Sequence, residues 1–136
     1  MTDIRAATPG EYVTVRAATP NEYVTARSIL DAAMLEVEPG LLRRSSVLVA
    51  RSGDRILGAL VLRGSEIEAI AVRPNRRGQG IGSALIAAAA RRRPVLRAGF
   101  DPRVRPFYTS LGFEIVREGE RCRGRYTTVD EERLRL

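Results

Sequence analysis

Residues 67 to 92 join an apolar segment, a turn of arginine and glycine, and an alanine-rich segment without interruption. The apolar residues from Ile67 to Val72 predict a strand, and the alanine-rich part predicts a helix from about Gly80 to Arg92, ending before Pro94. Closely spaced glycines leave consecutive backbone N–H groups unhindered in front of a helix N-terminus, where the helix dipole also favours negative charge. This strand, turn and helix are therefore expected to bind a diphosphate group.

The expected diphosphate-binding segment, called the glycine turn below, spans residues 76 to 83. The backbone N–H groups of Gln79 to Gly82 would hold the anion, and the guanidinium groups of Arg76 and Arg77 would add charge-assisted hydrogen bonds. A side chain at position 78, 80 or 82 would obstruct the ligand. The alternative is a glycine-rich helix entry that binds nothing. The candidate ligand-binding residues here are Arg76, Arg77, Gly78, Gln79, Gly80, Ile81, Gly82 and Ser83.

The composition removes several catalytic mechanisms. All 23 basic residues are arginine, and the 136-residue chain has no lysine, histidine or tryptophan. Without histidine there is no Ser-His or Cys-His nucleophile pair and no histidine-rich metal site, and without lysine there is no Schiff base and no P-loop lysine. A general base must therefore be a carboxylate, a tyrosine or water.

The length predicts one domain with a single core. The chain has no apolar run near the roughly 20 residues of a membrane span and no signal-peptide layout, so a cytoplasmic location without membrane contact is expected. The single cysteine, Cys122, cannot form an internal disulfide and is assigned to a strand. The formal charge of +7 suits an anionic ligand or nucleic acid. Scarce aromatic residues and dispersed arginines argue against nucleic acid.

The N-terminus contains a tandem repeat of eleven residues, Arg5–Val15 and Arg16–Ala26, in which nine positions are identical. Each copy carries Thr-Pro-x-Glu, which is typical of a helix start with a capping box. A helix begun in the first copy would meet Pro20 after about three turns. A helix begun in the second copy can continue with apolar residues spaced three and four apart, so only this copy is expected to start one.

These patterns predict the order of the elements. The first strand is expected at residues 13–18 and the first helix at about 20–35, with residues 1–14 as a duplicated arm or an extra strand before a single domain of residues 15–136. Further strands are expected at residues 46–51, 55–63, 66–72, 94–99, 113–117 and 123–129, and a third helix at 103–111. Strands 66–72 and 94–99 need a parallel, right-handed crossover, while the hairpins on either side are antiparallel. The prediction is an α+β fold with a mixed sheet.

Three segments together resemble the GNAT family of N-acetyltransferases, which transfer an acyl group from acyl-CoA to an amine. Residues 77–82 match the acyl-CoA signature of the family, Arg/Gln-x-x-Gly-x-Gly/Ala, and follow the Ala-Val-x-Pro of residues 71–74. Residues 107–113 match the Phe-Tyr-x-x-x-Gly-Phe block, and residues 15–19 resemble the usual first strand before a helix. The segments span almost the whole chain after the repeat, in the expected order.

The resemblance implies the acyl-CoA N-acyltransferase fold, with three α/β/α layers around the mixed sheet. It implies acetyl-CoA as cosubstrate, a primary amine as acceptor, direct attack of the amine on the thioester in a ternary complex, and no metal. The pantetheine arm is expected along Ile70, Ala71 and Val72, bound by main-chain hydrogen bonds like an added strand. Ile70 and Val72 also suit a core. Because family members often dimerise, the resemblance leaves a homodimer open.

The resemblance also implies catalytic residues. Tyr108 matches the family tyrosine that protonates the departing CoA thiolate, and the alternative is a core residue on an amphipathic helix. Glu66 matches the glutamate base of histone-type members, and Glu68, on the same strand face, is the second candidate. The alternative for both is a solvated glutamate on an exposed strand.

The chain departs from the family pattern in two places. The segment between the first helix and the second strand is short, and residues 99–102 read Gly-Phe-Asp-Pro where many members carry an asparagine that contacts the cofactor. A non-catalytic, acyl-CoA-binding regulator on the same fold is therefore the second hypothesis. Arg91–Arg93 are expected to complement the dipole at a helix C-terminus, or else to attract the CoA 3′-phosphate. Arg121, Arg123 and Arg125 alternate on a late strand and are candidates for an acidic-acceptor groove.

Overall fold

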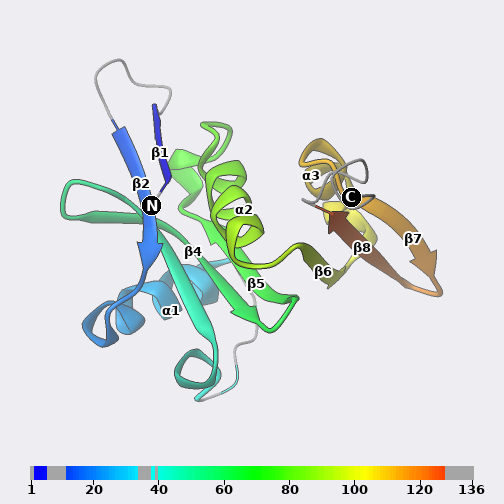
Figure 1. Ribbon diagram of the computed structural model, residues 1–136, viewed down its shortest axis with the longest axis horizontal. Coiled ribbons are helices and arrows are strands. Elements are labelled where there is room, and N and C mark those ends of the chain that lie inside the picture. The colour runs from blue at the N-terminus through cyan, green and yellow to red at the C-terminus, as the bar shows by residue number, and fades with distance from the viewer. Residues whose placement is uncertain (1, 6–11, 34–37, 39, 128–136) are drawn as a thin grey trace, which may run out of the picture.

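The computed structural model describes residues 2–5, 12–33, 38 and 40–127, and Figure 1 shows how their elements are arranged. The strands are β1 (Thr2–Arg5), β2 (Tyr12–Ala17), β3 (Ser46–Ser52), β4 (Arg55–Arg63), β5 (Glu66–Val72), β6 (Val95–Phe100), β7 (Glu114–Glu118) and β8 (Arg121–Thr127). The α-helices are α1 (Tyr23–Ala32), α2 (Ile81–Arg92) and α3 (Arg105–Ser110). Short 3₁₀ turns are η1 (Pro20–Glu22), η2 (Leu42–Arg44), η3 (Pro74–Arg76) and η4 (Pro102–Val104).

All the described strands belong to one sheet, in the order β1-β2-β3-β4-β5-β6-β8-β7. The β5–β6 pair is parallel, and the other neighbouring pairs are antiparallel. α2 makes the crossover between the two parallel strands, as the right-handed connection rule requires. The predicted mixed sheet is confirmed.

Helices cover both faces of this sheet. On one face, Ala26, Ile29 and Leu30 of α1 pack on buried residues of β3, β4 and β5. On the other face, α2 and α3 share a core with residues of β2 to β6 and with Cys122 of β8. The predicted three-layer α/β/α fold is confirmed. Figure 1 shows β6, β8, β7 and α3 as a group beside the larger part of the sheet.

The expected elements are present with small shifts at their ends. Two of the expected helices begin with a 3₁₀ turn, at Pro20 and at Pro102, before the α-helix starts. Such tight turns are frequent at helix N-termini, and they shorten α1 and α3 relative to the prediction. The last residues expected for the first helix and for the final strand lie outside the described residues.

The two copies of the repeat fold differently. Residues 12–14 of the first copy lie in β2, whereas the same three residue types at 23–25 begin α1. Val13 is 0% exposed, and its counterpart Val24 is 78% exposed. Thr2–Arg5 form an additional edge strand, β1, antiparallel to β2. The proposed boundary between residues 14 and 15 therefore falls within β2.

Glu22 fixes the passage from β2 into η1 and α1. Its carboxylate accepts hydrogen bonds from both terminal nitrogens of Arg16, at 2.7 and 2.8 Å, and from the Thr19 N–H at 2.9 Å. The side-chain hydrogen bond from Arg16 is the main cause that lowers the pKa of Glu22 to about 2. This contact supplies the glutamate half of the expected capping box.

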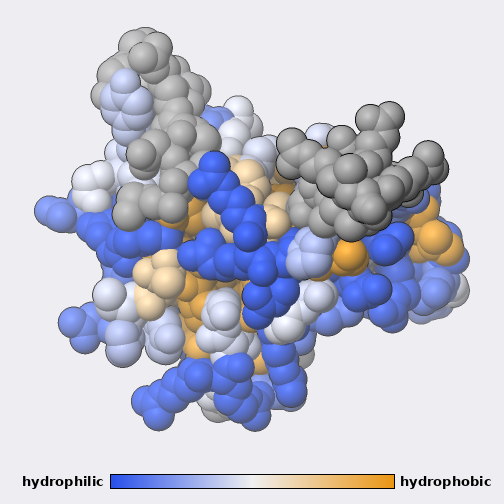
Figure 2. Space-filling model, in the orientation of Figure 1, coloured by the Kyte–Doolittle hydropathy of each residue, from blue (hydrophilic) through white to orange (hydrophobic). Residues whose placement is uncertain are grey.

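The described residues on the face shown in Figure 2 are mostly hydrophilic, with smaller apolar areas between them. Every helix within the described ranges is too short or too polar to cross a lipid bilayer.

Candidate active site

A cleft of about 590 Å³ lies where β5, the start of α2 and α3 meet. Every residue predicted to bind the cofactor lines this cleft except Gln79. We call the side formed by β5, the glycine turn and the start of α2 the main-chain wall. The opposite side, formed by residues of η4, α3 and the residue after α3, is called the side-chain wall. Ala33, next to the end of α1, also borders the cleft, so the cleft reaches both faces of the sheet.

The backbone N–H groups of the glycine turn are available to a ligand. The Ala84 N–H donates to the Gly80 carbonyl at 3.0 Å, whereas none of the six N–H groups from Gly78 to Ser83 donates to another backbone carbonyl of the described residues. The N-cap of α2 also lacks a side-chain hydrogen bond. These free donors lie at the positive end of a 12-residue helix, an arrangement that suits an anion.

The three glycines of the turn serve two different purposes. Gly78 and Gly80 have φ angles of 75° and 81°, in the left-handed region that favours glycine, and a Cβ at either would meet only open space. Gly82 is helical, but a Cβ there would lie 3.0 Å from Cε1 of Phe107. Backbone conformation therefore requires the first two glycines, and contact with the side-chain wall requires the third.

The gap between β5 and β6 exposes main-chain groups of β5. Within these two strands the single paired position is Glu66 opposite Arg97. The Arg73 N–H donates to the Leu57 carbonyl on β4 at 2.9 Å. Along an antiparallel strand, the backbone N–H and C=O groups of successive residues point to alternate sides. Since Arg73 bonds to β4, the N–H and C=O groups of residues 70 and 72 point away from β4, into the gap. An extended ligand can pair with this free edge.

Tyr108 lies in an aromatic cluster behind the side-chain wall. Its ring stacks on Phe100 with centroids 4.1 Å apart and meets Phe107 and Phe113 edge-on, each at 5.2 Å. It is 6% exposed, and its neighbour Phe107 lines the cleft in its place. Burial raises the pKa of Tyr108 to about 12, so its hydroxyl keeps its proton at neutral pH.

The two candidate glutamates lie on β5, outside the cleft lining. Ile67 belongs to the core under α2, so its neighbour Glu66 points to the opposite face. Glu66 is half exposed, and its Oε1 is 4.0 Å from Nη2 of Arg123. The β4–β5 register shifts between residues 61 and 62, which pair with residues 69 and 67, and this makes Glu68 the extra residue of a β-bulge. Ile67 and Ala69 face opposite sides of the sheet, so the bulge interrupts the regular alternation from which Glu66 and Glu68 were expected to share one face. Both carboxylates lie toward the closed end of the gap.

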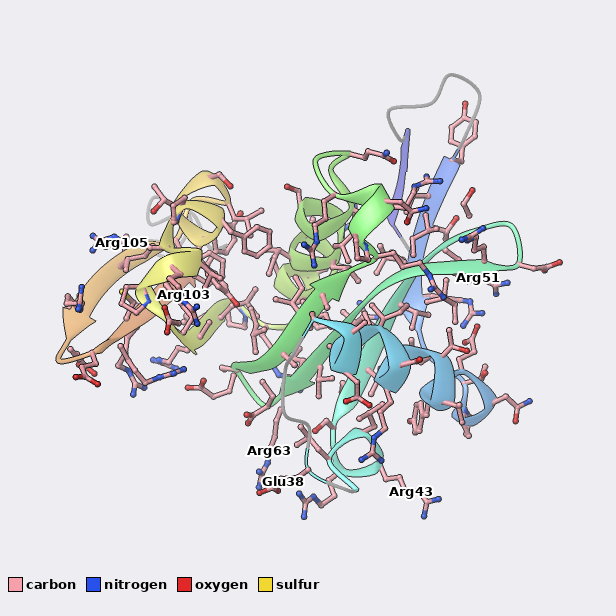
Figure 3. The ribbon with its side chains drawn as sticks, turned by 180° about the vertical axis from the view of Figure 1, so that it is seen from behind. Glu38, Arg43, Arg51, Arg63, Arg103 and Arg105 are labelled. Carbon is pink, nitrogen blue, oxygen red and sulfur yellow. The ribbon has the colours of Figure 1, made fainter. Side chains whose placement is uncertain are left out.

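At the position where many family members carry an asparagine, this chain has a turn cap. Oδ1 of Asp101 accepts hydrogen bonds from the Arg103 backbone N–H at 2.8 Å and from its Nε at 3.1 Å. The backbone bond is the main cause that lowers the pKa of Asp101. Figure 3 shows Arg103 and Arg105 beside α3, adjacent to Val104 of the cleft. Asp101 therefore shapes the start of the side-chain wall.

The three arginines at the end of α2 lie far from the glycine turn. A 12-residue helix separates them by about 18 Å. Arg92 donates to the Ala88 carbonyl and Arg93 to the Gly64 carbonyl, both at 3.1 Å. The Arg92 bond lies within the last turn of α2, as expected for an arginine at a helix C-terminus, whereas the Arg93 bond joins the end of α2 to the β4–β5 turn. No group of three or more cysteine, aspartate or glutamate side chains in the described part of the chain could hold a metal ion.

Sequence reasoning missed most of the side-chain wall. Val104, Phe107, Ser110 and Leu111 line the cleft, together with Ala33. The sequence did contain a signal for Phe107, because this residue precedes Tyr108 in the Phe-Tyr-x-x-x-Gly-Phe block. The contact of Phe107 with Gly82 joins two motifs that are 25 positions apart, so local patterns give no sign of it.

Residues 43–115 match the model of the acetyltransferase (GNAT) domain family. This range is more than half of the chain and contains both walls of the cleft. The chain therefore belongs to the GNAT family. A comparison with curated protein sequences gives no match.

Several solved structures share the fold. A GNAT-family protein of Desulfovibrio desulfuricans is 18% identical, with a TM-score of 0.68 over 86% of this chain and 99% of that chain. The protein yncA of Salmonella typhimurium, solved with acetyl-CoA, is 18% identical, with a TM-score of 0.65 over 87% and 95% of the two chains. A Bacillus subtilis acetyltransferase, solved in complex with CoA, is 18% identical, with a TM-score of 0.61 over 86% and 98%.

Proposed function

We propose that this protein transfers the acetyl group of acetyl-CoA to a primary amine, by direct attack of the amine within a ternary complex. The observation that carries the proposal is the row of free N–H groups from Gly78 to Ser83, which opens onto a cleft beside the unpaired edge of β5. Membership of the GNAT family supports an acyltransferase activity.

The cleft fits the separate parts of acetyl-CoA. The N–H groups of the glycine turn would hold the diphosphate, with Arg76 and Arg77 adding charge-assisted hydrogen bonds. The main-chain groups of Ile70 and Val72 would bind the pantetheine arm, and the apolar lining of the side-chain wall would cover it. The yncA and Bacillus subtilis structures, solved with acetyl-CoA and CoA, support acetyl-CoA as the ligand.

Bound acetyl-CoA would supply an activated acyl group as its thioester. The chain must then accept a proton from the ammonium form of the acceptor and return a proton to the departing sulfur. Glu66 is proposed as the base, directly or through a water molecule, with Glu68 as the second candidate. A ligand extended along β5 from the glycine turn points its far end toward these carboxylates, which lie near the opposite end of the strand. Tyr108 is proposed as the proton donor, because burial keeps its hydroxyl protonated.

A non-catalytic acyl-CoA-binding regulator is the second candidate function. One observation favours it, namely that Tyr108, Glu66 and Glu68 are all absent from the cleft lining. Such a regulator would bind acetyl-CoA without turning it over. The two functions therefore differ in turnover, and they share the glycine turn.

Calorimetry and a thiol-release assay test both functions. Titration at 0.15 M salt should show that acetyl-CoA binds and that an oligonucleotide does not. The assay is then run over a broad set of primary amines, and CoA release with at least one of them is expected. Oligonucleotide binding without acetyl-CoA binding would contradict the proposal, and tight acetyl-CoA binding without any turnover would favour the regulator.

Single substitutions test the proposed base. Glu66→Gln keeps the shape of the side chain and removes the proton acceptor, so kcat should fall by about 100-fold with little change in the KM for acetyl-CoA. Glu68→Gln is the matched comparison on the same strand. If Glu68→Gln shows the larger loss, the roles of the two carboxylates are exchanged.

A further inference from the structure

The α1 face of the sheet is only half covered. α1 packs on β3, β4 and β5, but no helix of the described chain covers β6, β8 and β7 on that side. Leu96 and Ala98 of β6 and Cys122 of β8 point into the core under α2 and α3. The alternate residues of these strands therefore point to the uncovered side. We call the exposed side chains of Arg97, Arg121, Arg123 and Arg125 on that side the arginine face.

Two of these arginines lie side by side, and neither has a counter-ion among the described residues. Arg97 and Arg125 are directly opposite each other on β6 and β8. Like charges in such cross-strand positions, with Cβ atoms about 5 Å apart, destabilise a sheet. Neither guanidinium forms an ion pair or side-chain hydrogen bond with any residue the structure describes.

The neighbouring acids do not neutralise this pair. Glu66 is opposite Arg97, and Glu114 is opposite Arg125, yet neither carboxylate comes within 4.0 Å of these guanidiniums. Arg123 instead has both of its carboxylate partners nearby, with Glu66 at 4.0 Å and Glu118 at 3.8 Å. Among the described residues, Arg97 and Arg125 are therefore a directly opposed pair of arginines on the arginine face with no carboxylate within 4.0 Å.

The pair borders the site where the proposed reaction takes place. Arg97 is opposite Glu66, the proposed base, at the closed end of the gap between β5 and β6. The cleft reaches the α1 face at Ala33, so an acceptor can approach from that side. Gly99, two residues after Arg97 on the same face, is exposed, and a Cβ there would meet nothing within 4 Å. This leaves open space beside the two guanidiniums.

We propose that Arg97 and Arg125 bind an oxyanion, either carboxylate or phosphate, carried by the acceptor amine. The inference rests on the proposed acetyltransferase function and names the class of its second substrate. An oxyanion between the two guanidiniums accepts charge-assisted hydrogen bonds from both and offsets their repulsion. The protein therefore selects anionic amines over neutral amines and polyamines.

Acceptor pairs that differ in the anionic group test this selection. Glycine, β-alanine, 4-aminobutanoate and 6-aminohexanoate are each compared with the corresponding amide, which samples the distance between amine and carboxylate. Phosphoethanolamine is compared with ethanolamine to test a phosphate group in place of the carboxylate. Putrescine is included as a cationic acceptor. The best acid is expected to exceed its amide by at least about tenfold in kcat/KM, and higher salt should reduce the ratio.

Arg125→Gln is the decisive variant, because residue 125 is exposed and is not opposite the proposed base. It should reduce the acid-to-amide ratio to about threefold or less without changing the KM for acetyl-CoA. Arg43→Gln removes the same charge at η2, which Figure 3 shows well away from β7 and β8, and should retain the full ratio. Circular dichroism and the melting temperature check that both variants fold.

Each outcome bears on the inference. Equal or better turnover of the amides or of putrescine in the wild type overturns it, and so does a ratio that survives Arg125→Gln. In both cases turnover still occurs, so the proposed function stands. Acetyl-CoA binding without turnover of any amine instead contradicts the proposed function and removes this inference with it.

Discussion

The two walls of the cleft present different chemical groups to a ligand. The main-chain wall offers backbone groups, namely the free N–H groups of residues 78 to 83 and the unpaired edge of β5. The side-chain wall offers aromatic and aliphatic surface from Val104, Phe107 and Leu111, with Tyr108 buried behind it. The first wall would bind the proposed ligand, acetyl-CoA, through backbone groups that depend little on the side chains of the wall. The second wall would contact the ligand through its side chains, so substitutions there change the contact surface directly.

The strongest test of this comparison breaks the main-chain wall. Gly80→Glu places a carboxylate at the mouth of the anion site and a side chain at a φ of 81°. Acetyl-CoA affinity should fall by more than about 100-fold by calorimetry, because both charge and shape oppose the diphosphate. Gly53→Glu is the matched control, since Gly53 has a φ of 59° and open space around its Cβ but lies outside the cleft. Equal affinity in the two variants would place the diphosphate elsewhere.

The next test asks whether the side-chain wall takes part in the chemistry. Tyr108→Phe removes the hydroxyl and keeps the stack on Phe100, so the fold should persist. If Tyr108 protonates the sulfur, kcat falls by roughly 100-fold while the KM for acetyl-CoA stays constant. With a pKa of about 12 for Tyr108, its ionisation should cause no loss of rate between pH 7 and 10.

Tyr126→Phe is the control for that test, because Tyr126 packs against Phe113 at 5.3 Å and does not line the cleft. It should leave kcat unchanged. An unchanged kcat in Tyr108→Phe as well would assign Tyr108 to the core alone.

A smaller effect is expected where the two walls touch. Gly82→Ala introduces a Cβ 3.0 Å from the Phe107 ring, which must shift by a few tenths of an ångström. Acetyl-CoA affinity should fall about threefold, because the ring is displaced within the cleft while the helix itself gains from alanine. In a Phe107→Ala background the same substitution should have no further effect, as a double-mutant cycle would show. Additive losses would mean that the two residues act separately.

The smallest effect is expected from a change remote from both walls. Deleting residues 5–15 joins Ile4 to Arg16, which places residues 2–4 where Val13, Thr14 and Val15 now complete β2. The sheet would lose its edge strand, and acetyl-CoA affinity should remain within about twofold by calorimetry. An unfolded product, judged by circular dichroism, would show that the first copy is integral to the domain.

The main-chain wall could be predicted from sequence because its requirements are local. Glycines at positive φ and free N–H groups before a helix follow from neighbouring residues, and residues 76 to 83 contain both signals. The side-chain wall could not be predicted, because Phe107 meets Gly82 only after α2 and α3 have packed on the sheet. The burial of Tyr108 likewise depends on Phe100 and Phe113, which come from other elements.

The register between β6 and β8 could not be predicted from the sequence either. The sequence shows that Arg121, Arg123 and Arg125 alternate, but only the β6–β8 pairing reveals that Arg97 is opposite Arg125. The repeat was partly predictable, since proline spacing excluded a helix in the first copy. The strand in that copy depends on the apolar pair Val13 and Val15, both buried against the core under α2, whereas the second copy continues into the helical spacing of Ala26, Ile29 and Leu30.

The position of the N-terminal strands bears on where this domain can accept additional residues. β1 is separated from the cleft-lining strand β5 by three intervening strands, and among the described strands it pairs with β2 alone. Extra residues at this border can form backbone hydrogen bonds along the sheet edge, as β1 does with β2. The opposite border, β7, pairs with β8, which carries three of the four arginines of the arginine face. Insertions are therefore expected to be tolerated better at the β1 border, which three strands separate from the cleft-lining strand β5.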